Sequence, residues 1–439
     1  MEKFNFKKMT PFKWFVLENF PFIEADFDAL TEWQLFCKLG KEINKIIKSE
    51  NELGTQVENV TNAFIELENY INNYFDNLDV QEEVNNKLND MAESGELEEI
   101  ISQYLELTTT YMFDTVDDML ASEHLIAGSR ARTLGFYEKN DGGGALYTIR
   151  EITNQDTPNT YSLMALDNSN TLVAELFTNN NEEIRITQLG IENNNKTILE
   201  YALENFKKVI IDQDITLTSG ITIDNNCNVE LLEGLGSIIN CEENGINLTK
   251  NSMQFINLFL EGEYNTDSIG INLNSSYNYF ENVMITHFGI GLNMSESGSW
   301  NNNFIHCNFN QNTNFGIYII STSEFQHNDL HFDKCRLVGN GQNVLDNSNA
   351  EITKGDAIRI KGGINITITD CDIETNSNAG IYLSDNNYQL RNVKVENCYI
   401  ENNKLTSIYY YKGSGPHKHI YLNNNFFNPT SRNIPNKLA

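Results

Sequence analysis

The chain has 439 residues, too many for one ordinary hydrophobic core, so the length predicts two or three domains or an array of repeats. Lysine and arginine number 30 against 61 aspartate and glutamate residues, which gives a formal net charge of −31. This charge argues against nucleic-acid binding and against adhesion to an anionic membrane, so we expect a neutral or locally matched partner.

The N-terminal segment, residues 1–37, contains an apolar run from Phe12 to Phe27 that Glu18 and Glu24 interrupt. A membrane span needs about 20 uninterrupted apolar residues, so we expect no membrane insertion. The run also lacks the basic start and the small-residue cleavage site of a signal peptide, which indicates folding in a cytoplasm.

Apolar residues then recur at alternating intervals of four and three, and Glu50 is the one charged member of the set. The set consists of Leu39, Ile43, Ile46, Glu50, Leu53, Val57, Val60, Phe64, Leu67, Ile71, Tyr74 and Leu78. This period, kept over roughly five heptads, favours a left-handed coiled coil over the alternative, a long amphipathic helix in a bundle. The stalk would be about 60 Å long at about 1.5 Å per residue. Ile43 and Ile46 favour a homotrimer.

Two short helices follow the stalk, Val80 to Met91 and Glu96 to Leu105, with Gly95 placed to end the first. The segment 79–101 resembles a module of tail and neck appendages of phages that infect Gram-positive bacteria. The resemblance implies a virion protein whose N-terminus contacts other tail or neck proteins.

The next segments, 113–120, 132–137 and 140–147, resemble the small domain that precedes the β-helix in many phage tailspikes. The run 140–144, Asn-Asp-Gly-Gly-Gly, predicts a tight hairpin between two short apolar strands, because these residues accept positive φ angles. A phosphate cradle is the alternative, but neither Gly-Lys-Ser/Thr nor a helix start follows.

Residues 186–211 predict a strand, a short helix and a strand. This pattern resembles the opening of pectate-lyase-like β-helices, in which a helix plugs the first coil. The acidic, glycine-containing loop usual after the first strand is replaced here by residues 192–196, Glu-Asn-Asn-Asn-Lys.

The second half of the chain repeats one strand pattern about every 25 residues. The copies are 257–260, 282–285, 306–309, 334–337, 370–373, 397–400 and 424–427. A small residue followed by Ile precedes or follows each copy, and we call these dipeptides the second ladder. They are Gly245-Ile246, Gly270-Ile271, Gly289-Ile290, Gly316-Ile317, Ala357-Ile358, Gly380-Ile381 and Ser407-Ile408. This period predicts a solenoid in which each repeat makes one coil. Leucine-rich repeats share the period, but their Leu-x-x-Leu-x-Leu frame is missing.

The seven cysteines are widely spaced and form no CxxC pair, which argues against disulfides and a zinc site. We expect reduced, buried thiols, with Cys307, Cys335, Cys371 and Cys398 in one interior file. Asparagines at the bends tolerate left-handed backbone and can hydrogen-bond to their copies on the next coil. No proline occurs from Asn159 to Gly415, as a hydrogen-bonded ladder requires.

The sequence therefore predicts a mainly β protein, a right-handed single-stranded parallel β-helix with an N-terminal α-helical coiled-coil stalk, assembled as a trimer. The predicted parts are a virion-attachment segment 1–37, a stalk with short helices 38–110, a β-rich junction domain 111–180, the β-helix 181–415 and a C-terminal cap 416–439. The segment 339–355 is an insertion too long for one coil, and we expect it to protrude and to concentrate ligand contacts.

Carboxylates on successive coils, about 4.8 Å apart, reach the separations that glycosidases use. Asp370 and Asp372 flank Cys371 and are expected on one outward strand face, and Glu374 and Glu401 are expected to stack. Asp333 and Glu396 are expected near the same flank. These six residues are the candidate catalytic groups; the alternatives are solvated surface charges, cation binding and sugar-hydroxyl binding.

Aromatic residues suited to stacking on sugars, if they face outward, are Trp300, Tyr318, Tyr382 and Tyr399. The alternative is that the rings fill the core, although for Tyr318 and Tyr382 an exposed column is favoured. His327 and His331 have zinc spacing only on a helix, and the local pattern indicates strand and loop. We therefore expect neither a metal nor a cofactor.

The resemblance to phage appendages covers residues 79–215 by motif and the remainder by architecture. It implies adsorption to a host surface glycan, often with depolymerase or teichoic-acid-degrading activity, by a protein of the virion assembled in the host cytoplasm. Two hypotheses stay open, a glycoside hydrolase or polysaccharide lyase acting on a cell-wall polymer, and a non-enzymatic adhesin or structural fibre. A secreted bacterial polysaccharide lyase is disfavoured by the missing signal peptide and by the stalk.

Overall fold

A computed structural model describes residues 110–191, 196–295, 297–322, 326–341, 354–385, 389–411 and 419–427, together with Ile65, Met91 and Ser94. The described ranges from residue 110 onward belong to one compact unit, Leu105–Ala439. The predicted attachment segment and coiled-coil stalk lie outside the described residues, apart from those three single positions. Most of the predicted insertion also lies outside them.

The first described part is a five-stranded sheet, sheet A, with strand order β1-β2-β3-β5-β4. Its strands are β1 (Thr110–Phe113), β2 (Arg130–Thr133), β3 (Leu146–Glu151), β4 (Leu163–Ala165) and β5 (Leu172–Leu176). The helix α6 (Val116–Leu120) begins at Thr115, which forms a capping box with Asp118. Strands β2 and β3 are antiparallel, but residues 134–145 join them, so the predicted tight hairpin is corrected to a longer loop.

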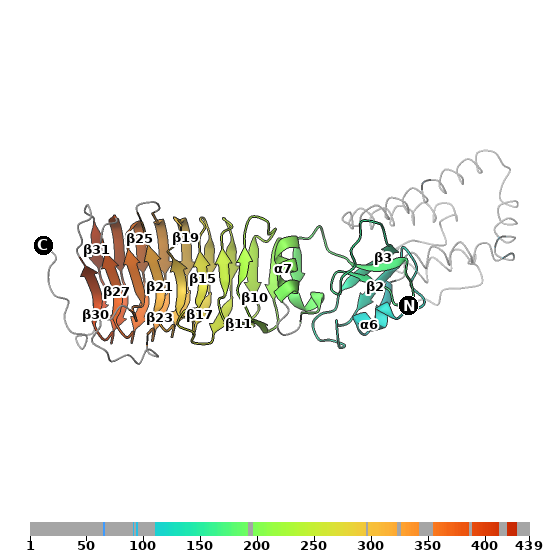
Figure 1. Ribbon diagram of the computed structural model, residues 1–439, viewed down its shortest axis with the longest axis horizontal. Helices are drawn as coiled ribbons and strands as arrows, with labels where there is room; N and C mark the ends of the chain where they lie inside the picture. The colour runs from blue at the N-terminus through green and yellow to red at the C-terminus, as the bar shows by residue number, and fades with distance from the viewer. Residues whose placement is uncertain are drawn as a thin grey trace, which may run out of the picture. The chain divides into compact units, whose positions relative to one another are not determined.

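The remaining strands form a solenoid of three parallel sheets, and they follow one another along the stack in Figure 1. Sheet B holds β6 (Glu183–Arg185), β7 (Lys208–Ile211), β10 (Leu231–Gly234), β13 (Gln254–Ile256), β16 (Tyr279–Glu281), β19 (Trp300–Ile305), β22 (Asn328–Asp333), β25 (Gly363–Thr369), β28 (Leu390–Glu396) and β31 (Ile420–Asn423).

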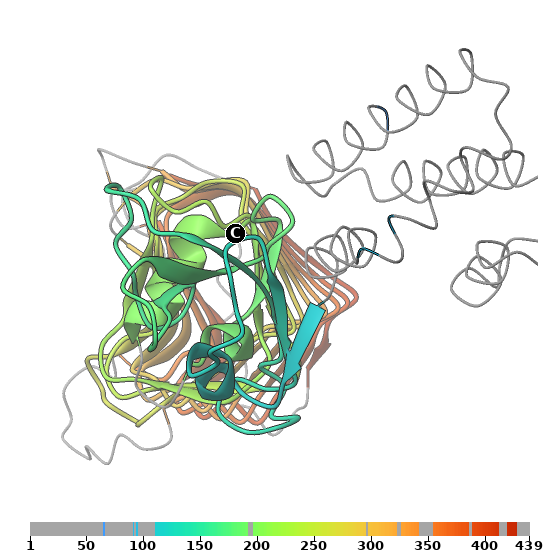
Figure 2. The ribbon, with the colours of Figure 1, turned by 90° about the vertical axis from the view of Figure 1, so that its right-hand side faces the viewer.

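Sheet C holds β8 (Ile215–Leu217), β11 (Ile238–Cys241), β14 (Phe259–Gly262), β17 (Met284–Thr286), β20 (Asn308–Asn310), β23 (Arg336–Val338), β26 (Asp372–Glu374), β29 (Tyr399–Glu401) and β32 (Phe426–Phe427). Sheet D holds β9 (Ile221–Ile223), β12 (Ile246–Leu248), β15 (Ile269–Leu273), β18 (Ile290–Met294), β21 (Phe315–Ile320), β24 (Ile358–Lys361), β27 (Ala379–Ser384) and β30 (Thr406–Tyr411). Each coil thus adds one strand to sheets B, C and D in turn, and Figure 2 shows the coils lying one behind another.

The interior of the solenoid consists of files of like side chains, because each inward residue packs on its copy in the next coil. Phe255, Phe280, Phe304 and Phe332 stack with ring centroids 4.6 to 4.8 Å apart. The predicted cysteine file is confirmed: Cys307, Cys335, Cys371 and Cys398 are free thiols, each at most 1% exposed.

A buried asparagine ladder closes one corner of the coils. Asn340 accepts a hydrogen bond from the backbone N–H of Asn312 (3.0 Å), and its amide donates to Asn376 Oδ1 (2.9 Å). The amide of Asn376 in turn donates to Asn403 Oδ1 (2.8 Å). At the bend between sheets B and C, one column of residues has left-handed backbone, with φ between 50° and 55°. The column is Asn257, Asn282, His306, Lys334, Asp370, Asn397 and Asn424. The predicted role of asparagine at the bends is confirmed.

The solenoid begins with β6, the short 3₁₀ helix η2 (Ile186–Leu189) and the helix α7 (Lys196–Asn205). The predicted strand at Ile186 is therefore wrong, since the strand ends at Arg185 and the chain turns into η2. The predicted short helix is confirmed, and Figure 1 shows it beside the first coils. Its apolar face, with Leu199 and Leu203 fully buried, joins the core of the solenoid.

Two further predictions are corrected. The second ladder contains Gly291-Leu292 rather than Gly289-Ile290, because Leu292 pairs with both Ile271 and Ile317. Both dipeptides obey the same two-residue alternation, so spacing alone does not choose between them. The cap predicted from residue 416 is also wrong for residues 420–427, which form β31 and β32 and extend sheets B and C.

Candidate functional site

The outer face of sheet C carries a cluster of charged and aromatic side chains. Arg336, Asp372, Tyr399 and Phe426 occupy one register position on four successive coils. Two residues further along their strands, Glu374 and Glu401 lie at one register position, so their predicted stacking is confirmed.

The carboxyl groups of this cluster have unequal surroundings. Arg336 Nε lies 3.3 Å from Asp372 Oδ2 and offsets its negative charge. A hydrogen bond with Asp372, partial burial and the nearby carboxylates of Asp372 and Glu401 raise the pKa of Glu374, and the charge of Arg336 opposes the rise. Two neighbouring carboxyl groups with one pKa raised are the arrangement that separates a general acid from a general base.

Exposed aromatic rings adjoin these carboxyl groups. The rings of Tyr399 and Phe426 stack with centroids 4.9 Å apart and planes 2° from parallel. Their residues are 38% and 54% exposed, so the outer edges of the two stacked rings form an exposed aromatic platform beside Asp372. A hydrogen bond from its hydroxyl to Glu401 raises the pKa of Tyr399. The carboxylate of Glu401 thus acts electrostatically on both Tyr399 and Glu374.

The other three candidate carboxylates lie apart from this cluster. Asp370 is at the left-handed bend (φ 53°) before β26, so its predicted place on one strand face with Asp372 is wrong. Asp333 and Glu396 end strands of sheet B, and Thr369 lies between them in the register. Asp333 accepts a hydrogen bond from Thr369 (3.0 Å) and lies 3.4 Å from a lysine ammonium.

The carboxylate of Glu396 is likewise paired with a neighbouring side chain. It forms an ion pair with Lys394, and that contact lowers the pKa of Glu396. A group held ionised in this way is poorly suited to donate a proton. Of the six candidates, the three that the structure places together on sheet C are Asp372, Glu374 and Glu401.

The four candidate aromatics are spread over three sheets. Trp300 starts β19 in sheet B and is 52% exposed. Tyr318 and Tyr382 lie in one outward column of sheet D, half-buried, with Arg359 between them in the register. Only Tyr399 adjoins the carboxyl cluster.

Arg336 and Phe426 complete the cluster but were not among the candidates from the sequence. The signal was present, since both occupy the same position in the repeat as Asp372 and Tyr399. Aligning the outward positions of the copies, as well as the inward ones, would have found them.

His327 and His331 do not share a site. His327 is fully buried, and burial lowers its pKa to about 4. His331 lies on β22 with Nε2 2.9 Å from Asp329. Across the described ranges, no three His, Cys, Asp or Glu side chains gather closely enough to hold a metal ion. In the same residues, no helix is both long and apolar enough to cross a membrane.

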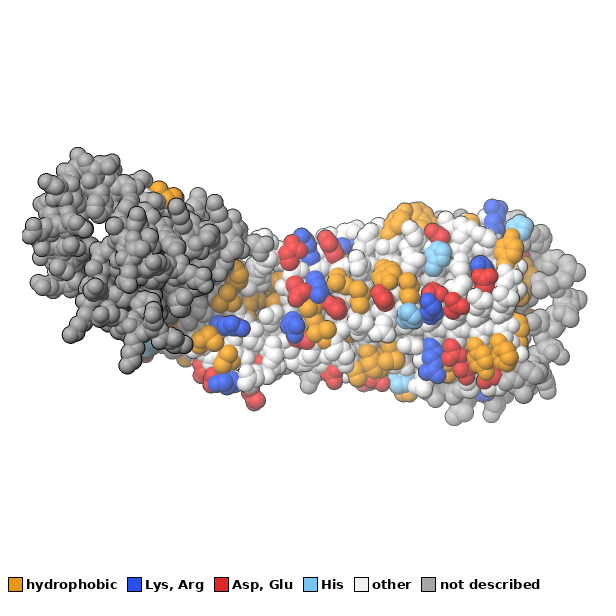
Figure 3. All heavy atoms as spheres, turned by 180° about the vertical axis from the view of Figure 1, so that it is seen from behind, with side chains coloured by type: hydrophobic (Ala, Val, Ile, Leu, Met, Phe, Trp, Pro, Cys, Tyr) orange, Lys and Arg blue, Asp and Glu red, His pale blue; other side chains and the backbone are white. Residues whose placement is uncertain are grey.

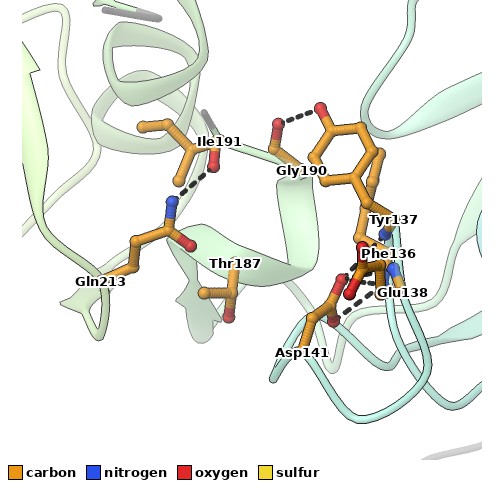
Figure 4. A pocket seen from close by; sticks show the side chains of 8 residues that line it. All are labelled: Phe136, Tyr137, Glu138, Asp141, Thr187, Gly190, Ile191 and Gln213. Atoms are coloured by element: carbon orange, nitrogen blue, oxygen red, sulfur yellow. Dashed lines mark hydrogen bonds between the residues drawn. The ribbon is translucent and has the colours of Figure 1, made fainter. Parts of the chain in front are cut away.

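A pocket of about 210 Å³ lies between the loop after β2 and the first coil, as Figure 4 shows. Tyr137 donates a hydrogen bond to the carbonyl of Gly190 (2.7 Å) across it. Burial favours the neutral form of Asp141, but hydrogen bonds from the backbone N–H groups of residues 136, 137, 138 and 143 lower its pKa. Asp141 therefore shapes the loop, in keeping with the turn interpretation of the Asn-Asp-Gly-Gly-Gly run.

Comparison with known proteins adds a family description. Residues 264–427 match the family model of the right handed beta helix region. This match covers the coils that carry the carboxyl cluster and, with the three parallel sheets, confirms the predicted right-handed parallel β-helix. No curated protein matches the sequence significantly.

The chain is also similar in fold to solved tailspike structures. The tailspike of Acinetobacter phage vB_ApiP_P1 has 12% identity and a TM-score of 0.47, over 73% of this chain and 70% of that one. The tailspike gp49 of Acinetobacter baumannii bacteriophage Fri1 has 12% identity and a TM-score of 0.35, over 72% and 75%. Tailspike protein 4 of bacteriophage CBA120 has 12% identity and a TM-score of 0.46, over 74% of this chain and 49% of that one. These values concern the general fold and assign no residue.

Proposed function

We propose that the chain is a phage virion appendage of the tailspike type, which recognises and depolymerises a polysaccharide or teichoic acid of the host cell surface. The observation that carries the proposal is the sheet C cluster, in which Glu374, with a raised pKa, lies beside the Arg336-paired Asp372 and an exposed aromatic platform. The Fri1 tailspike is described as a capsular polysaccharide depolymerase, and we infer the same class of activity for this chain.

The chemistry that these residues support is hydrolysis of a glycosidic bond. A sugar ring packs against the exposed edges of the stacked Tyr399 and Phe426 rings, which places the next linkage beside the carboxyl groups. The protonated Glu374 gives its proton to the glycosidic oxygen as the bond to the anomeric carbon breaks. Water adds to that carbon and its proton returns to the hydrogen-bonded pair of Glu374 and Asp372, which lie too close together to hold the water between them.

The assembly proposed with this function is a homotrimer. Residues 1–37 would contact other virion proteins, and residues 38–110 would form the coiled-coil stalk, after assembly in the host cytoplasm. The repeat of apolar residues from Leu39 to Leu78 supports the stalk. Light scattering should give three times the 50.1 kDa mass of one chain. A monomeric mass would contradict the trimer.

The activity is tested by incubating the full chain with purified host wall polymer and measuring released reducing ends and unsaturated sugars. We expect D372N and E374Q each to lower the rate by about 10²- to 10⁴-fold, because each removes one proton-transfer group. D333N is the matched control, since Asp333 lies on sheet B outside the cluster, and it should cleave at the wild-type rate.

The outcome separates the two hypotheses left open by the sequence. Cleavage that D372N and E374Q leave unchanged would reject this pair as the catalytic groups. Binding of the polymer with no product over hours would instead establish a non-enzymatic adhesin.

A further inference from the structure

The outer face of sheet D differs in charge from the rest of the solenoid. No described strand of sheet D contains an aspartate or glutamate, although the chain has 61 of them. The charged residues of these strands are Arg359 and Lys361, both on β24. Figure 3 shows one face of the molecule, on which acidic, basic and hydrophobic side chains lie side by side.

Arg359 is a buried structural cation. It is 5% exposed, its Nε lies 2.5 Å from Asp356 Oδ2, and its guanidinium lies 4.6 Å from the ring centre of Tyr382. Asp356 also accepts hydrogen bonds from the Asn378 amide (2.7 Å) and the Ala379 N–H (3.0 Å). The charge of Arg359 is therefore offset within the protein, and the residue supports the Tyr382 ring.

Lys361 has no such partner. It is half-buried, its Nζ lies 5.7 Å from the ring centre of Tyr318, and no carboxylate of the described residues lies within ion-pair distance. Burial and the nearby charge of Arg359 lower the pKa of Lys361, and the charge of Asp356 opposes the change. An anion placed beside the ammonium would relieve both effects.

Tyrosine rings surround this cation on the adjoining coils. Tyr318, Arg359, Tyr382 and Tyr409 occupy one register position on four successive coils. The rings of Tyr382 and Tyr409 stack with centroids 5.3 Å apart. Arg359 and Tyr409 lie on the coils before and after Tyr382 and cover its ring faces, so the two tyrosines offer their outward edges to the apolar face of a sugar.

We propose that the outer face of sheet D binds an anionic saccharide, with its carboxylate or phosphate group on Lys361 and its sugar ring on Tyr382 and Tyr409. This inference rests on the proposed function and names its substrate class, an acidic surface polymer. The net charge of −31 does not prevent such binding, because charges beyond about 10 Å are screened and the nearby Asp356 is already paired with Arg359.

The test measures by calorimetry how the full chain binds three polymers. These are polygalacturonate, which carries carboxylates, poly(glycerol phosphate), which carries phosphates, and dextran, which is neutral. We expect binding to at least one of the two anionic polymers and weaker binding to dextran. The anionic polymer that binds more tightly identifies the anionic group, carboxylate or phosphate. K361M should weaken that binding by about tenfold or more, and K361R should restore most of it. K394M is the matched control, because Lys394 lies on sheet B in an ion pair, and it should bind as the wild type does.

Several results would overturn the inference. These are wild-type affinity in K361M, equal affinity for dextran, or a changed assembly mass in K361M, which would make sheet D an interface between copies. Failure to bind either anionic polymer would also overturn it. Cleavage of host wall polymer by the same preparation would then leave the proposed function standing.

Discussion

The interior and the outer face of the solenoid are made by alternate residues of the same strands, yet they follow different rules. Inside sheet C, Leu337, Ile373 and Ile400 continue one apolar file from coil to coil. Beside them on the outer face, Arg336 is followed by Asp372, a residue of opposite charge. Stacking on the neighbouring coils restricts the residue types of the interior, whereas the residue types of the outer face can differ from coil to coil on the same backbone. Function is therefore expected on outward positions.

The sharpest test of this contrast uses two adjacent residues of β26. Ile373 is 0% exposed, so I373A should lower the free energy of unfolding by about 2–5 kcal/mol through lost burial and a cavity. E374Q should change it by no more than about 0.5 kcal/mol while abolishing cleavage. Guanidinium unfolding of both variants, followed by circular dichroism, measures the difference. Equal destabilisation would mean that Glu374 has a structural role.

The buried asparagine ladder extends the contrast to polar groups. N340A removes the partner of the Asn312 N–H and of the Phe309 carbonyl, and the two groups stay buried. We expect a loss of about 1–3 kcal/mol, the desolvation penalty of an unsatisfied polar group. N308A, on the outer face of β20, is the control and should be nearly neutral in the same unfolding experiment. Equal stabilities would show that the ladder adds little.

The smallest expected effect is a shift in the pH dependence of cleavage. Glu374 must be protonated to act as an acid, so activity should fall as the pH rises through its raised pKa. R336M removes a positive charge that lowers this pKa, so the falling limb should move to higher pH. E401Q removes a negative charge that raises it, so the limb should move to lower pH. Rate profiles showing shifts of the same sign in both variants would contradict the acid role of Glu374.

Much of the solenoid could be predicted from the sequence, because its interior depends on local repetition. The cysteine file and the strand copies from 257–260 to 424–427 follow from spacing alone, and the structure places each copy in sheet C or at the bend before it. The stacking of Glu374 on Glu401 follows from the same alignment.

The errors occur where spacing is ambiguous or where contacts are not local. Gly289-Ile290 and Gly291-Leu292 fit the same alternation, and the pairing of Leu292 with Ile317 decides between them. Asp370 follows the strand alternation, but the bend rotates it out of the outer face of sheet C. Arg359 and Tyr382 lie on different coils, and no short sequence motif predicts their contact.

The most direct test of the account is a crystal structure of the E374Q protein with an oligosaccharide of the host wall polymer. We predict a sugar ring against the exposed edges of Tyr399 and Phe426, with a glycosidic oxygen within about 3 Å of the residue 374 side chain. Oligosaccharide bound only at other places on the solenoid, with the outer face of sheet C empty, would contradict the proposed active site.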